Sequence, residues 1–323
     1  MAVNPREAQT ATLQPPPTTV PLPETAGEPV RQTSLWRDAL RRYMRNKAAV
    51  GSAIMFVIIV LYCFLIPGFW FVPGIWTTLF DIDPNDVNFA DVRLPPSLEH
   101  PFGTDQFGRD LFTRVAAGGQ ISIGIGFAAT IAILVVGVAY GSIAGFVGGR
   151  TDNAMMRFLD ALYGLPYLPF AIIALAIVGT VNFWTMVIAL TIASWFTAAR
   201  IVRGQVITLK QNDYVRAAHA VGARWYRVLT RHLLPNTLGI LIIAMFLELP
   251  TVILGEAFLS FIGLGINPPD ASWGSLASEA REAYRTHPAD LWIPCLFIAA
   301  LVLCANFIAD GLRDALDPRT KEG

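Results

Sequence analysis

The stretch "VAAGGQISIGIGFAATIAILVVGVAYGSIAGFVGG" runs from Val115 to Gly149 without a single Asp, Glu, Lys or Arg. A helix needs roughly 20 apolar residues to cross the hydrocarbon core of a membrane, so this stretch predicts one long span. A second uncharged stretch runs from Ala161 to Ala199. Its length predicts two spans joined by a tight turn near residues 180–182. A large soluble core is excluded, because it would interrupt these stretches with charge every turn or two.

The whole composition agrees with this interpretation. Hydrophobic residues make up 54% of the 323, charged residues only 15%, and the mean hydropathy is +0.50, whereas a soluble domain carries about 25% charged residues. The fold class is therefore an all-α polytopic membrane protein. We expect six transmembrane helices at about residues 48–67, 118–147, 156–180, 183–205, 236–262 and 290–309. Three cysteines, Cys63, Cys295 and Cys304, fall within spans and are interpreted as small apolar packing residues.

The segments outside the spans differ in composition. Residues 1–34 are rich in proline and predict a disordered tail, and residues 35–47 predict a basic amphipathic helix at the membrane surface. Residues 68–117 are expected to form one outer segment. A five-span core follows at 118–309, with an inner loop at 206–235 and an outer loop at 263–289, and residues 310–323 form a second tail.

The distribution of Lys and Arg predicts the orientation. If the N-terminus is cytoplasmic, 19 of the 24 Lys and Arg residues lie on the cytoplasmic side and five lie outside. Cytoplasmic loops of membrane proteins carry this excess of positive charge. We therefore expect both termini, and the loop at 206–235, to be cytoplasmic.

That inner loop contains "DYVRAAHAVGARWYRVLTRHLLPN", from Asp213 to Asn236. On a helix at 100° per residue, Tyr214, Ala217, Ala218, Val221 and Trp225 fall within a narrow apolar stripe and the arginines fall on another side. Gly222 is a candidate break in this helix. The pattern fits a helix at the lipid surface and equally a helix that docks into a groove on a cytoplasmic partner.

Several motifs carry a family resemblance. Arg216-Ala217-Ala218, then Gly222 and Leu234-Pro235, resemble the EAA loop of binding-protein-dependent ABC importer permeases. The stretches "HPFGTDQFGRDLFTRVAAGGQISIGIG", "GGRTDNAMMRFLDALYGLPYLPFAI", "GEAFLSFIGLGINPPDASWG" and "DGLRDALDPR" are similar to the dipeptide, oligopeptide and nickel permease family, in particular its C-type transmembrane subunit. The resemblance covers roughly residues 35–319, in which these long motifs occur in the family's order.

The resemblance implies the ABC importer permease (type I) fold, in a bacterial or archaeal cytoplasmic (inner) membrane. The chain would form half of a pore that moves peptides inward by ATP-driven alternating access, with nickel or another small solute as the alternative cargo. Its partners would be a homologous second permease, two cytoplasmic ATPase subunits that bind ATP and Mg, and an extracytoplasmic substrate-binding protein.

In that family the EAA loop is the coupling helix, which sits in a cleft on an ATPase subunit. Tyr214, Ala217, Ala218 and Gly222 would form its docking surface. Arg216 stands where the family has an acidic residue, which suggests an acidic residue on the partner. The full set expected to couple to the ATPase is Tyr214, Arg216, Ala217, Ala218, Val221, Gly222, Trp225, Leu234 and Pro235.

Enzyme motifs are absent from the sequence. It has no GxxxxGK[ST] phosphate-binding loop and no HExxH zinc motif, so we expect no catalytic residue, metal or cofactor in this chain, and no nucleic-acid partner. Glu248 and Glu256 lie within the fifth span, where a carboxylate is expensive. They are expected either to line the translocation pathway or to hold helices together through hydrogen bonds. An ion-coupled secondary transporter would use such carboxylates to bind its coupling ion, and remains an alternative.

Two packing features are also expected. Asp160 is predicted to pair with a nearby arginine such as Arg157. Glycines recur every fourth residue along one face of the second span and predict the close approach of another helix; they are Gly137, Gly141, Gly145 and Gly149.

Overall fold

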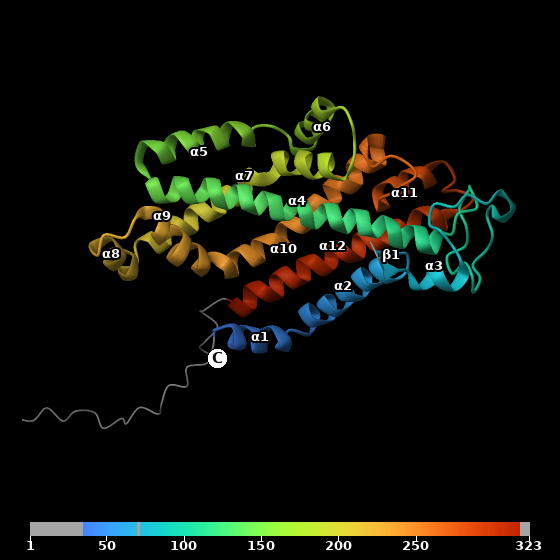
Figure 1. Ribbon diagram of the computed structural model, residues 1–323, viewed down its shortest axis with the longest axis horizontal. Coiled ribbons are helices and arrows are strands. Elements are labelled where there is room, and N and C mark those ends of the chain that lie inside the picture. The colour runs from blue at the N-terminus through green and yellow to red at the C-terminus, as the bar shows by residue number, and fades with distance from the viewer. Residues whose placement is uncertain (1–34, 70–71, 317–323) are drawn as a thin grey trace, which may run out of the picture.

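The computed structural model describes residues 35–69 and 72–316, so the expected tail at 1–34 and residues 317–323 lie outside the described residues. The described chain is almost entirely helical, with one two-stranded hairpin (Figure 1). Its first part consists of α1 (Leu35–Arg45), α2 (Lys47–Leu65), β1 (Gly68–Phe69), β2 (Val72–Pro73), α3 (Ile75–Phe80), η1 (Phe89–Asp91), α4 (Leu111–Val147), α5 (Gly149–Tyr163), α6 (Tyr167–Val178) and α7 (Phe183–Lys210). Its second part consists of α8 (Asp213–Ala220), α9 (Trp225–Val228), η2 (Leu229–Leu233), α10 (Leu234–Leu259), η3 (Ser260–Leu264), α11 (Trp273–Glu279), η4 (Ala280–Glu282) and α12 (Pro288–Leu316).

Five helices are long and apolar enough to span a membrane: α2, α4, α7, α10 (with η3) and α12. They confirm the spans expected at 48–67, 118–147, 183–205, 236–262 and 290–309. The helix α4 has 37 residues, which corresponds to roughly 55 Å at 1.5 Å per residue and exceeds the roughly 30 Å of hydrocarbon. Its first residue, Leu111, is seven residues earlier than the expected start of the span. The segment between the first two spans consequently ends at Asp110 rather than at residue 117.

The span expected at 156–180 is not one straight helix. Two helices, α5 and α6, replace it and meet at a bend of 92°, so the chain has a sixth span only if this pair is counted as one. The backbone explains the break. Leu165 precedes Pro166, and the residue before a proline is disfavoured in helical conformation. Pro166 itself is extended and begins α6. The tight turn expected after this span is confirmed, because Asn182 caps α7 through hydrogen bonds to the backbone of Trp184 and Thr185.

The centre of the molecule is the pair α4 and α7. Glycines of α4 let the two backbones approach closely: a Cβ atom added at Gly137 would lie 2.6 Å from the Cβ atom of Ala198, and one added at Gly145 would lie 2.8 Å from the carbonyl oxygen of Arg203. Gly141 has the same role. The prediction that Gly149 belongs to this set is wrong. Gly149 lies beyond the end of α4, has a positive φ of 61°, and has no neighbour within 4 Å of its Cβ position.

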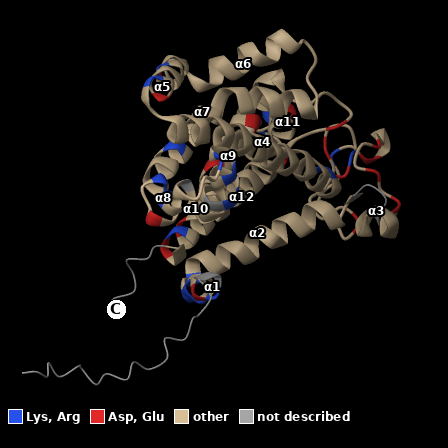
Figure 2. Cartoon of the chain, turned by 60° about the vertical axis from the view of Figure 1, so that its left-hand side comes forward, with Lys and Arg blue, Asp and Glu red and all other residues tan. Residues whose placement is uncertain are grey.

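The two ends of the bundle differ in charge. Loop helices α8 and α9 lie at one end with α1 and the end of α12, whereas α3 and residues 81–110 lie at the other (Figure 1). Arginines and lysines gather around α1, α5 and α8, and acidic residues follow the segment near α3 (Figure 2). Of the segment expected at 35–47, residues 35–45 form the helix α1, and the C-terminal segment expected from residue 310 begins as the last turns of α12, to Leu316.

Candidate functional site

The connection between α7 and α10 folds as two short helices at one end of the bundle (Figure 1). The first, α8, ends before Gly222, which adopts a positive φ of 78°. This conformation favours glycine because a Cβ atom is disfavoured there. The single apolar stripe expected along residues 214–225 is therefore interrupted, and Trp225 begins a new helix, α9, which continues through η2 into α10.

One side of this connection packs on the bundle. Val215, Val228 and Leu233 are fully buried against Val202 and Val206 of α7. Burial of several aliphatic side chains stabilises the connection by about 1.5–3 kcal/mol for each one. The two short helices are consequently attached to the bundle, and a force on them acts directly on α7.

The opposite side of the connection is exposed. Tyr214, Arg216, Ala217 and Trp225 are accessible, and Val221 is 85% exposed next to the Gly222 turn. Large exposed apolar side chains that cluster in one place are typical of protein or membrane contact sites. This exposed surface, made of residues 214, 217 and 221, is called the loop face below. Trp225, across the Gly222 turn, is half-exposed, and its ring centre lies 6.0 Å from that of Phe146 in the buried cluster.

The remaining expected coupling residues divide between the two sides. Ala218 is half-buried and packs on the same apolar cluster as Val215, so it is not part of the loop face. Leu234 also packs on this cluster, whereas Pro235 is exposed in the first turn of α10. Arg216 lines a polar cavity of about 400 Å³ together with Lys210 and Asp152.

Arginines of α7 connect it to α5 near the same end of the bundle. The Arg203 guanidinium donates from two nitrogens to both carboxylate oxygens of Asp152, one of them at 2.6 Å. Arg200 donates to Asp160 at 2.7 Å and lies 4.2 Å from the ring centre of Tyr163. The expected pairing of Asp160 with Arg157 is wrong, because Arg200 reaches the carboxylate from the facing helix.

Glu256 of α10 is fully buried inside the bundle. Its carboxylate accepts hydrogen bonds from the hydroxyls of Ser122, at 3.0 Å, and Ser260, at 2.7 Å. Ser122 in turn accepts a hydrogen bond from the backbone N–H of Trp273, at 3.1 Å. This chain joins α4, α10 and α11, so the structure places Glu256 where it ties helices together. No sequence pattern indicates a role for Ser122, which stands among apolar residues.

Glu248 lies on a different face of the same helix. Thr251, Gly255 and Phe258 stand three, seven and ten residues after it, so the four share one face of α10. Those three residues line an apolar cavity of about 590 Å³, bounded also by α6, α11 and α12. Glu248 is half-buried beside this face, and no ion pair to it is found among the described residues. Glu248 therefore stands on the face of α10 that lines this cavity further along the helix, although it is not itself a lining residue, whereas Glu256 is enclosed in the bundle.

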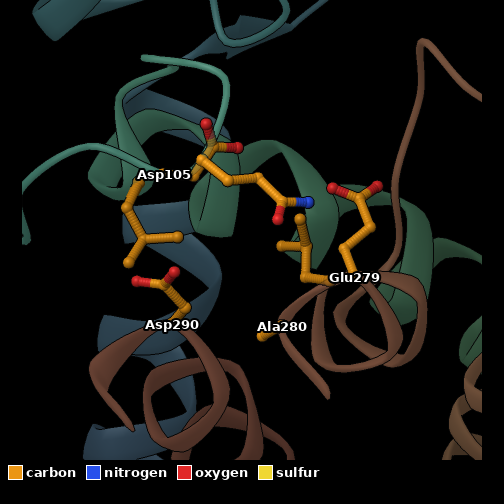
Figure 3. Close-up of a pocket in the computed structure, with 7 residues that line it drawn as sticks. Asp105, Glu279, Ala280 and Asp290 are labelled. Atoms are coloured by element: carbon orange, nitrogen blue, oxygen red, sulfur yellow. The ribbon is translucent and has the colours of Figure 1, made fainter. Parts of the chain in front are cut away.

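A charged cluster holds the segment between α3 and α4 against the bundle. Arg109 donates to Asp105 at 2.7 Å and to Glu279 at 2.6 Å, and Arg114 donates to Glu279 at 3.2 Å. Arg93 pairs with Asp290 of α12. Figure 3 shows Asp105, Glu279 and Asp290 around the small pocket between these elements. The sequence signal for this cluster is an arginine, Arg114, directly at the border of the uncharged stretch 115–149.

No group of three or more His, Cys, Asp or Glu side chains that could hold a metal ion is found in residues 35–69 and 72–316. The arrangement is instead a multi-pass helical bundle with an anchored, exposed loop at one end, a charged outer segment at the other, and an apolar cavity beside α10.

The comparisons with known proteins define the class. The chain belongs to the family of binding-protein-dependent transport system inner membrane components, whose model matches residues 137–322. Residues 34–96 match the N-terminal transmembrane domain of oligopeptide transport permease C. The family resemblance expected from the motifs is thereby confirmed.

Individual relatives cover nearly the whole chain. It is 42% identical to the oligopeptide transport system permease protein OppC of Bacillus subtilis, over 90% of this chain and 92% of the relative. It is 41% identical to OppC of Escherichia coli, over 90% and 94%, and 39% identical to the dipeptide transport system permease protein DppC of Bacillus subtilis, over 89% and 87%. The protein is thus a multi-pass transport permease of this family.

Proposed function

We propose that the chain forms one half of the translocation pore of an ABC importer for peptides. A homologous permease supplies the other half, two cytoplasmic ATPase subunits bind ATP and Mg and drive the cycle, and an extracytoplasmic binding protein delivers the peptide. The relatives are named for oligopeptide and dipeptide transport, which favours a peptide over nickel or another small solute.

The observation that supports this proposal most is the loop face. It exposes Tyr214 and Val221 while the other side of the same connection is buried on α7. An ATPase subunit that binds the loop face can pull on α7, and through the close α4–α7 contact it can move the bundle. Arg216 and Pro235, two further residues expected to couple to the ATPase, are also exposed.

In the proposed cycle the chain itself performs no chemistry. ATP binding closes the ATPase pair, draws the two loop connections together and turns the cavity outward, and hydrolysis resets the assembly. This is rigid-body alternating access, in which nucleotide biases an interface with two arrangements. Glu248, at the side of the apolar cavity, is the proposed polar contact for the peptide. The loop connection and both termini face the cytoplasm, as the distribution of Lys and Arg indicates.

Reconstitution tests the proposal. The chain is purified with and without its co-expressed second permease and ATPases, placed in vesicles, and supplied with binding protein, labelled oligopeptide and ATP. We expect uptake only from the complete assembly, and none with labelled nickel. Uptake by this chain alone, driven by a proton or sodium gradient, would show a secondary transporter and refute the proposal.

A further inference from the structure

Helix α1 places basic and apolar side chains side by side on the surface. Arg37, Arg41 and Arg45 are exposed, and Leu40 and Met44 are 61% and 60% exposed. At 100° per residue, Leu40 and Met44 directly border Arg37 on the helix. A helix that exposes an apolar edge next to a basic edge is suited to the interface of a membrane, where the apolar edge contacts lipid chains and the basic edge contacts the headgroups.

An apolar cavity of about 250 Å³ lies beneath α1. Leu40 and Tyr43 of α1 form one wall, Ile242 of α10 forms a second, and Leu312 and Leu316 of α12 form a third. Because Leu40 lines the cavity and is also largely exposed, the cavity opens along the apolar edge of α1. Water is a poor occupant, since it needs two or more polar partners and this lining is almost wholly apolar.

The position of the cavity matches the depth at which lipid chains meet their headgroups. Leu312 and Leu316 lie in the last turns of the spanning helix α12, and α1 directly precedes the spanning helix α2. The cavity is therefore at the end of the membrane-crossing bundle, with the basic edge of α1 next to it.

Charge indicates which lipid fits. The helix carries four arginines and one aspartate over eleven residues, and Lys47 follows it. Clusters of four or more basic residues beside a spanning helix attract anionic headgroups, at about 1 kcal/mol per Lys or Arg. No ion pair to Arg37, Arg41 or Arg45 is found within the described part of the chain.

We propose that this cavity is a binding site for an anionic phospholipid, with one acyl chain between α1, α10 and α12 and the phosphate held by Arg37 and Arg41. The lipid anchors α1 to α12 and so fixes the start of the first span. This site is separate from the loop face and from the cavity beside Glu248.

Lipid binding to the purified full-length chain tests the headgroup. Phosphatidylglycerol and phosphatidylcholine with identical acyl chains are titrated in uncharged detergent, and bound lipid is counted by native mass spectrometry. We expect phosphatidylglycerol to bind at least tenfold more tightly. The variant Arg37→Gln/Arg41→Gln should lower its affinity roughly fivefold for each arginine removed.

The matched control is Arg150→Gln/Arg157→Gln, which removes the same charge from exposed positions of α5. It should leave the affinity unchanged. Equal binding of the two lipids would overturn the proposal, because binding would then not depend on the charge of the headgroup. An equal effect of the two double variants would also overturn it, because binding would then not depend on the position of the arginines.

A second measurement tests the acyl chain. Ile242→Trp fills the cavity from a partly exposed position, so folding should survive, as checked by an unchanged melting temperature without added lipid. It should reduce phosphatidylglycerol binding at least fivefold. A photo-crosslinker at Leu312 should yield a lipid adduct in native membranes. An adduct with another subunit, or with residues of this chain that precede α1, would identify a protein occupant and overturn the proposal.

Discussion

The Ser122 hydroxyl donates a hydrogen bond of 3.0 Å to the Glu256 carboxylate, although the two residues are 134 positions apart in the chain. Both are buried, and Ser260 donates to the same carboxylate. A carboxylate inside a membrane protein is tolerated where hydrogen bonds or a partner compensate its burial. This contact joins α4 to α10 and explains why Glu256 can occupy the interior of the bundle.

Replacement of Glu256 should therefore reveal a structural role. Glu256→Leu leaves the hydroxyls of Ser122 and Ser260 buried without their acceptor, and each such group costs about 1–3 kcal/mol. Glu256→Gln keeps an acceptor oxygen and should cost much less. Melting temperatures of the two purified variants in detergent measure the difference. If both variants melt at the same temperature, the hydrogen bonds do not stabilise the bundle.

The α4–α7 contact predicts a clear effect at Gly141. A Cβ atom there would overlap the carbonyl oxygen of Ala199, so Gly141→Ala must push the helices apart at a cost of about 1–3 kcal/mol. Gly51→Ala in α2 is the matched control, because nothing lies within 4 Å of its Cβ position. It should be neutral or stabilise by up to about 1 kcal/mol. Similar melting temperatures for the two variants would argue against a close contact.

The charged cluster at the outer end predicts that Glu279 is important for stability. Glu279→Ala removes the partner of Arg114, whose side chain is only 2% exposed. Breaking a buried ion pair lowers the folding stability by about 3–5 kcal/mol. For Glu279→Ala we expect a smaller loss of stability, about 2 kcal/mol, because the Glu279 side chain itself is 28% exposed. Glu282→Ala, at an exposed position in the same segment, should be silent. Protease sensitivity of residues 81–110 in intact membranes provides the measurement, and equal sensitivity of both variants would count against the prediction.

The loop face predicts a defect in coupling without a defect in folding. Val221→Asp places a charge on the exposed apolar surface and should lower ATPase affinity roughly thirtyfold, the effect of losing an interface anchor worth about 2 kcal/mol. Ala218→Arg is a poorer test, since Ala218 packs on this chain's own core. Co-purification of the ATPases and peptide uptake are measured at matched membrane abundance.

The control for this experiment is Asn212→Asp, which adds the same charge just before α8 and keeps a side chain suited to begin a helix. It should assemble and transport normally. Wild-type assembly and uptake by Val221→Asp would exclude the loop face as the ATPase contact and favour a helix at the lipid surface.

Membrane orientation predicts opposite labelling of two exposed positions. Leu98 is 92% exposed at the acidic end, and Asn212 is exposed at the basic end. A cysteine at Leu98 should react with an impermeant thiol reagent on spheroplasts, and one at Asn212 only after permeabilisation. The unsubstituted chain gives the baseline. The reverse pattern would invert the proposed topology.

The amino-acid sequence alone determined the class of fold and most of its elements. Hydropathy and the length of an uncharged stretch are properties of the local sequence. A stretch such as 115–149 therefore predicts its own helix without any information on tertiary contacts. The break between α5 and α6 was also encoded locally, in Leu165 and Pro166, but the hydropathy of residues 161–199 is uniform across it and concealed it. The turn at Gly222, where φ is positive, was likewise indicated by the residue type.

Only the tertiary structure decided which polar groups meet. Asp160 binds Arg200 of the facing helix rather than Arg157 of its own, and Glu256 is enclosed by serines while Glu248 is only half-buried on another face of α10. The sequence places both glutamates in one apolar helix and cannot distinguish them. Their difference depends on how α10 is rotated against α4, α6 and α11, and that rotation results from side-chain packing summed over the whole bundle rather than from any local pattern.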